Sequence, residues 1–101
     1  MELIQILLPL TDDEGRPFPA ASFDRLAQQL TEKFGGVTSF TRSPAEGRWK
    51  QDGGTTHDEI VVIEVMTDRA DREWWGDLRE RLKREFDQDD VLIRSQSVRC
   101  L

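Results

Sequence analysis

Cysteine, histidine and long apolar runs are scarce in this chain of 101 residues, and each scarcity excludes a class of protein. Cys100 is the only cysteine, so the sequence offers neither an internal disulfide nor a CxxC metal or redox site. No apolar run approaches the roughly 18 residues that a membrane-spanning helix needs. The opening MELIQILLPL begins with an acid and lacks a basic segment, so we predict a first strand and a cytoplasmic protein with no membrane partner.

Positive charge is also in short supply, with 14 basic residues against 20 acidic ones and a net charge of −6. Proteins that bind nucleic acids use clustered Lys and Arg, whereas the bases of the second predicted helix are interleaved with acids that neutralise them. We therefore expect no nucleic-acid partner. The acidic cluster Asp12, Asp13 and Glu14 lacks the alternating oxygen ligands of a calcium loop, so we interpret it as a solvated turn. We predict no metal and no cofactor.

What the sequence does contain is one strand-helix-strand pattern that occurs twice. The first copy predicts a strand, a helix and a strand over residues 2–8, 22–34 and 37–42, and the second over 57–67, 71–86 and 91–98. This order in about a hundred residues is typical of a single ferredoxin-like α+β domain, residues 1–101. We predict a βαββαβ sandwich, with a four-stranded antiparallel sheet and both helices on one face. Proteins with this fold have many different activities, so the fold alone does not predict a function.

Capping signals set the ends of the two predicted helices. Ser22 is a candidate N-cap of the first helix, and the pair Gly35-Gly36 ends it. The second helix begins at Asp68 or Asp71. The spacing of its apolar residues predicts that Trp74 and Trp75 are both at least partly buried.

Strand alternation indicates what the sheet carries on the face that the helices leave open. Seven of its eleven expected residues are apolar: Leu3, Leu7, Ile60, Val62, Met66, Leu92 and Val98, with Gln5, Glu64, Arg94 and Gln96 as a polar island. So apolar a face favours burial against a second copy of the chain, and we predict a homodimer through it. The polar island either lines a pocket between the two sheets or pairs Glu64 with Arg94 across the interface.

Residues 23–101 resemble an uncharacterised family of small bacterial α+β proteins, a domain of unknown function. The matching elements are Phe34-Gly35-Gly36-Val37-Thr38, Gly47-Arg48-Trp49, Glu59 before an apolar strand, and the helix-to-strand phrase over 86–92. The resemblance implies no activity. It draws attention to Trp49 and Glu59, which have no obvious structural role.

Five residues are candidates for binding a ligand: Trp49, His57, Glu59, Glu64 and Arg94. His57 is the only histidine and shares a strand face with Glu59, which suits general acid-base chemistry, although a surface histidine is the commoner outcome. Trp49, beside Gly47, either stacks on a ligand or caps the core. No nucleophile can be placed beside His57, and no catalytic motif stands out.

The sequence therefore favours a self-associating module without an assignable activity. The alternative is a small dimeric α/β-barrel enzyme, similar to a monooxygenase or an isomerase, with a pocket near Trp49, His57 and Glu59.

Overall fold

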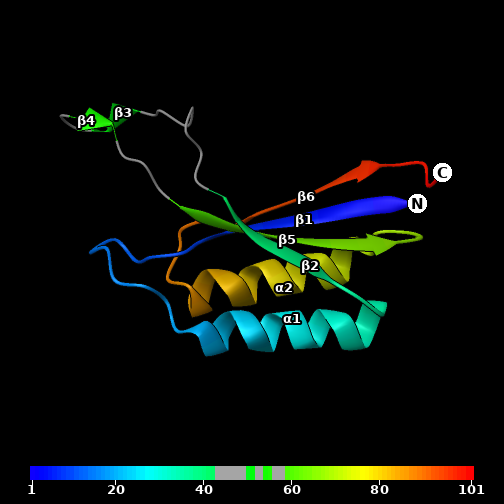
Figure 1. Ribbon diagram of the computed structural model, residues 1–101, viewed down its shortest axis with the longest axis horizontal. Helices are drawn as coiled ribbons and strands as arrows, with labels where there is room; N and C mark the ends of the chain where they lie inside the picture. Colours follow the sequence, from blue (N-terminus) through cyan, green and yellow to red (C-terminus); the bar gives the residue numbers. More distant parts are fainter. Residues whose placement is uncertain (43–49, 52–53, 56–58) are drawn as a thin grey trace.

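The computed structural model describes residues 1–42, 50–51, 54–55 and 59–101. The secondary structure in Figure 1 follows the predicted order, with a short extra pair of strands after the first unit. The elements are β1 (Glu2–Pro9), α1 (Ala20–Phe34), β2 (Thr38–Arg42), β3 (Lys50–Gln51), β4 (Gly54–Thr55), β5 (Ile60–Thr67), α2 (Arg72–Glu85) and β6 (Leu92–Ser97).

Four strands form the main sheet in the order β2-β5-β1-β6, and every neighbouring pair is antiparallel. Both helices lie side by side on one face of this sheet (Figure 1). The predicted ferredoxin-like α+β sandwich is therefore confirmed. The strands β3 and β4 pair with each other in a separate two-stranded sheet, which Figure 1 shows beyond one end of the main sheet.

The core lies between the main sheet and the two helices. Alternate residues of the two central strands face it: Ile4, Ile6 and Leu8 of β1 and Val61, Ile63 and Val65 of β5 are all buried. The helices contribute Leu26 and Leu30 from α1 and Trp75, Leu78 and Leu82 from α2. Apolar residues recur every two positions in the strands and every 3.6 positions in the helices, so the buried faces of all these elements meet in one apolar core.

Aromatic rings join the two helices at both ends of this interior. At one end Phe34 stacks on Trp75, with ring centroids 5.3 Å apart and planes 12° apart, and Trp74 packs edge-on against both rings. At the other end Phe18 and Phe23 each lie 5.1 Å from the ring of Phe86. The prediction that both adjacent tryptophans are at least partly buried is confirmed, since Trp75 is buried and Trp74 is half-buried.

The helix ends follow the predicted boundaries in three cases out of four. Gly35 adopts a left-handed conformation with φ of 87°, and its N–H donates to the carbonyl of Thr31. Asp71 is the N-cap of α2, with its carboxylate accepting from the N–H groups of Glu73 and Trp74, and α2 ends at Glu85, next to Phe86.

The predicted N-cap at Ser22 is wrong. Helix α1 begins at Ala20, with Pro19 in the capping position, and Ser22 is only 8% exposed inside the first turn. Proline fixes an extended backbone before a helix, and the alanines that follow are strong helix formers, so the helix starts before the serine. Phe18, which precedes Pro19, packs its ring against that of Phe86.

No helix among the described residues is long and apolar enough to cross a membrane.

Candidate functional site

A row of three polar side chains crosses the open face of the sheet at right angles to the strands. Gln5 of β1 stands opposite Glu64 of β5 on one side and opposite Arg94 of β6 on the other. Gln5 Nε2 donates to Glu64 Oε2 at 2.6 Å, and Arg94 Nε donates to Gln5 Oε1 at 2.8 Å. We call Glu64, Gln5 and Arg94 the cross-strand row. One amide thus satisfies an acid and a base at once, which fixes its orientation.

The cross-strand row keeps its two charges apart. Because β1 lies between β5 and β6, Glu64 and Arg94 are connected through Gln5 and form no direct ion pair with each other. Within the described part of the chain, Arg94 forms side-chain hydrogen bonds through Nε alone, and its side chain is exposed. The carboxylate of Glu64 is half-buried. A positive and a negative group therefore stand on opposite sides of the central strand and remain accessible to a partner.

The apolar residues around the row are only partly open to solvent. Met66 is 40% exposed and Leu92 is 50% exposed, while Leu3 and Leu7 are half-buried. Val62 is only 2% exposed within a single chain, so the prediction that it belongs to an uncovered apolar face is wrong. Alternation assigns a side chain to a face, but its burial depends on what else lies over that face. The uncovered part of the face is thus smaller than the sequence indicates.

The other predicted site residues form no described constellation. Trp49 and His57 lie outside the described residues, so the pocket expected around them is not described. Glu59 is exposed and precedes β5, and its carbonyl accepts a hydrogen bond from the N–H of Leu10 at 3.1 Å. The structure therefore brings Glu64 and Arg94 together, through Gln5, and places Glu59 apart from them at the end of the strand.

The acidic loop after β1 is a turn in which Asp12 and Glu14 have partners within the loop. Asp12 Oδ1 accepts from the N–H groups of Glu14 and Arg16, both at 2.9 Å, and the Arg16 guanidinium contacts both acids. The backbone N–H of Arg16, the largest cause, lowers the pKa of Asp12 below its ordinary value. No cluster of three or more potential metal ligands occurs among the described residues.

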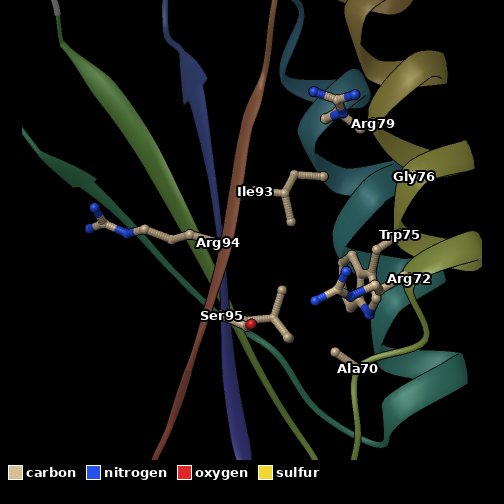
Figure 2. Close-up of a pocket in the computed structure, with 9 residues that line it drawn as sticks. Ala70, Arg72, Trp75, Gly76, Arg79, Ile93, Arg94 and Ser95 are labelled. Carbon is tan, nitrogen blue, oxygen red and sulfur yellow. The ribbon is translucent and has the colours of Figure 1, made fainter.

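A pocket between α2 and β6, on the opposite side of the sheet, was not predicted from the sequence. Its volume is about 190 Å³, and it is lined by Ile4, Ala70, Arg72, Trp75, Gly76, Arg79, Ile93, Arg94 and Ser95 (Figure 2). The signal that could have indicated it is the spacing of Arg72, Gly76 and Arg79, which share one helical face. A glycine at the centre of such a face leaves a gap opposite the neighbouring strand.

The fold resembles that of a solved phage SAM lyase in complex with S-methyl-5'-thioadenosine. The superposition has a TM-score of 0.64 and 14% sequence identity, and it covers 95% of this chain and 80% of that one. At this identity the likeness shows a common fold. No protein-family model matches the chain, and no curated protein matches it.

Proposed function

We propose that this chain is a self-associating module that pairs with a second copy of itself through the open face of its sheet. The observation that carries the proposal is the cross-strand row, which presents Arg94 and Glu64 on opposite sides of β1. A surface that carries both charges about a central line is complementary to itself. The exposed side chains of Met66 and Leu92 beside the row supply apolar area for the contact.

The position of the charges selects the symmetry of the pair. A two-fold axis that runs parallel to β1, between two facing sheets, brings β6 of one copy over β5 of the other. Arg94 of each copy then lies over Glu64 of its partner, and two equivalent ion pairs form. An axis perpendicular to the strands would place Arg94 over Arg94 and Glu64 over Glu64, which is repulsive. The parallel axis is therefore the arrangement that the charges favour.

Charge-reversal variants test both the pairing and its symmetry. Arg94→Glu and Glu64→Arg each convert two attractive contacts into two repulsive ones, which costs about 2 kcal/mol of association, roughly thirtyfold in Kd. The double variant restores both contacts, because the charges have only exchanged places. It also preserves the bonds within each chain, since the Gln5 amide can turn over to suit the exchange.

Sedimentation velocity on the wild type, the two single variants and the double variant at several concentrations measures these differences. Arg84→Glu is the matched control, because it makes the same charge change at an exposed position on α2, away from the open face. Circular dichroism confirms that each variant is folded. A wild type that is monomeric at tens of micromolar contradicts the self-association. A dimeric wild type whose double variant stays as weak as the single ones contradicts the symmetry alone.

A small dimeric enzyme is the second candidate, and the likeness to the phage SAM lyase complex favours it. S-adenosylmethionine carries a sulfonium cation and a carboxylate, which match Glu64 and Arg94 in charge. In this proposal the face between two copies holds such a ligand, with Glu64 beside the cation and Arg94 beside the carboxylate. Calorimetric titration with S-adenosylmethionine and with S-methyl-5'-thioadenosine tests the idea. Binding that Glu64→Gln weakens supports it, and absence of binding by both compounds contradicts it.

A further inference from the structure

The pocket between α2 and β6 lies on the helix side of the sheet and shares only Arg94 with the cross-strand row. Residues 70–79 form one wall, and Ile93 and Ser95 of β6 form the other (Figure 2). The floor is apolar, because Ile4 and Trp75 are buried and Ile93 is half-buried. The pocket thus combines an apolar bottom with a polar rim, which is typical of a binding site for a small organic molecule.

Gly76 lines this pocket without a side chain that would occupy part of it. It lies inside α2, where glycine is a poor residue because it costs the helix more backbone freedom than alanine does. Its φ is not positive, so the backbone conformation does not demand glycine. A Cβ at this position would meet no atom within 4 Å, so packing does not demand it either. The glycine therefore serves neither the helix nor its packing, and what its missing side chain provides is space in the pocket.

The charged residues that line the pocket are all basic, in a chain whose net charge is −6. Its lining contains three arginines and no acidic residue. Figure 2 shows the side chain of Arg94 pointing away from the pocket, toward the open face where it bonds to Gln5. Arg72 and Arg79 remain as the cations of the pocket.

Of these two arginines, Arg79 forms ion pairs with acidic neighbours, and Arg72 forms none with any described residue. Arg79 Nη1 lies 3.2 Å from Asp90 Oδ1, and Nη2 lies 3.9 Å from Glu80 Oε1. Both acids lie outside the lining, so they fix the guanidinium at the rim without entering the pocket. Arg72 is exposed and forms no ion pair or side-chain hydrogen bond with any described residue. The pocket therefore offers one positioned guanidinium and one that can close over a ligand.

We propose that the pocket between α2 and β6 binds a small organic carboxylate. Its apolar body lies against Trp75 and Ile93, and its carboxylate accepts hydrogen bonds from Arg72 and Arg79, with the Ser95 hydroxyl as a further donor. Arginine is suited to this task because its planar guanidinium matches a carboxylate in geometry. The volume is below that of a pocket for a drug-sized molecule, so the ligand is a small one. This site goes beyond the proposed self-association and does not depend on it.

Titration with benzoate, followed by NMR of the labelled protein, tests the site. We expect the amide signals of Gly76, Ile93 and Ser95 and the indole signal of Trp75 to shift in a saturable manner. Benzamide has the same shape without the charge and is expected to bind about tenfold more weakly or worse. Equal shifts with benzamide, or no saturable shift with benzoate at these positions, would overturn the proposal.

Three variants separate a specific site from a general attraction of anions. Arg72→Gln and Arg79→Gln should each weaken benzoate binding about tenfold, through loss of a charge-assisted hydrogen bond. Arg84→Gln removes the same charge from the same helix outside the pocket and should leave binding unchanged. Gly76→Ala should weaken binding while raising the melting temperature by about 2–8 °C. An equal loss with Arg84→Gln, or unchanged binding in both pocket variants, would refute the site.

Discussion

Replacement of Trp75 by alanine is expected to remove a large part of the stability of this protein. The side chain is 7% exposed, stacks on Phe34 and meets Trp74 edge-on at 4.8 Å. A buried tryptophan removes about 150–250 Å² of surface from water, which at about 25 cal/mol per Å² corresponds to about 4–6 kcal/mol. Measured costs of Trp→Ala in cores are about 3–5 kcal/mol, and we expect this range.

The expected cost of Trp75→Ala is large compared with the free energy of unfolding of a small protein. A chain of this length has a free energy of unfolding of about 5–15 kcal/mol, so a loss of about 3–5 kcal/mol is between a fifth and all of it. The pocket beside Trp75 moderates the loss, because water can enter the space that the indole vacates. The structure thus favours a folded but weakened variant.

Urea denaturation followed by far-ultraviolet circular dichroism measures the loss as a shift of the midpoint at constant slope. Trp74→Ala is the matched control, because Trp74 is the neighbouring tryptophan of the same helix but is only half-buried. We expect it to cost about 1–2 kcal/mol. A loss below about 0.5 kcal/mol for Trp75→Ala, or a larger loss for Trp74→Ala, would refute the assignment of Trp75 to the core.

Two further predictions concern local structure. Asp71→Ala should lower the free energy of unfolding by about 1 kcal/mol in urea melts, because it removes the carboxylate that accepts from the N–H groups of Glu73 and Trp74. Asp71→Asn should keep most of that stability, because its side-chain oxygen can accept the same bonds. Equal losses in both variants would show that the cap is unimportant. Folding lowers the pKa of Asp12 through the N–H of Arg16, so its contribution to stability is present above the unfolded pKa and lost as the pH falls through the folded one. Carboxyl NMR should therefore give Asp12 a lower midpoint in the folded chain than in urea, and identical midpoints would contradict the geometry of the turn.

Apolar periodicity was sufficient to predict the fold, because each element turns most of its buried residues to one face. The alternation in residues 4–8 and 61–65 assigned the core of the sheet correctly, and Gly35 gave the end of α1 through its left-handed backbone. Ser22 was misassigned because a local capping signal competed with Pro19 and the alanines after it, and the helix began earlier. Apolar periodicity predicts which face of a helix or strand is buried. It does not predict at which of several neighbouring residues a helix begins.

The candidate sites were less predictable, because they depend on distances between elements. Glu64 and Arg94 were recognised as polar residues on the open face, but the role of Gln5 between them required the register of three strands. Val62 was assigned to the right strand face, yet its burial is a property of the whole fold. The pocket beside Gly76 reflects the spacing of a helix and a strand, which no sequence period encodes. Substitution of Val62 by Lys would therefore test folding rather than dimerisation.

The central position of β1 has a consequence for how the chain folds as it is synthesised. This first strand pairs with β5 and β6, so its partners begin 58 or more residues later in the sequence, and Glu2 meets Ser97. During synthesis the apolar segment Ile4–Leu8 therefore stays unpaired at least until β5 has been made, and one side of β1 lacks its partner until β6 has been made. Such long-range pairings slow folding, because a large loop must close before any contact rewards it. Until these partners are available β1 is exposed to aggregation, and a chaperone that binds short apolar segments would find its target there.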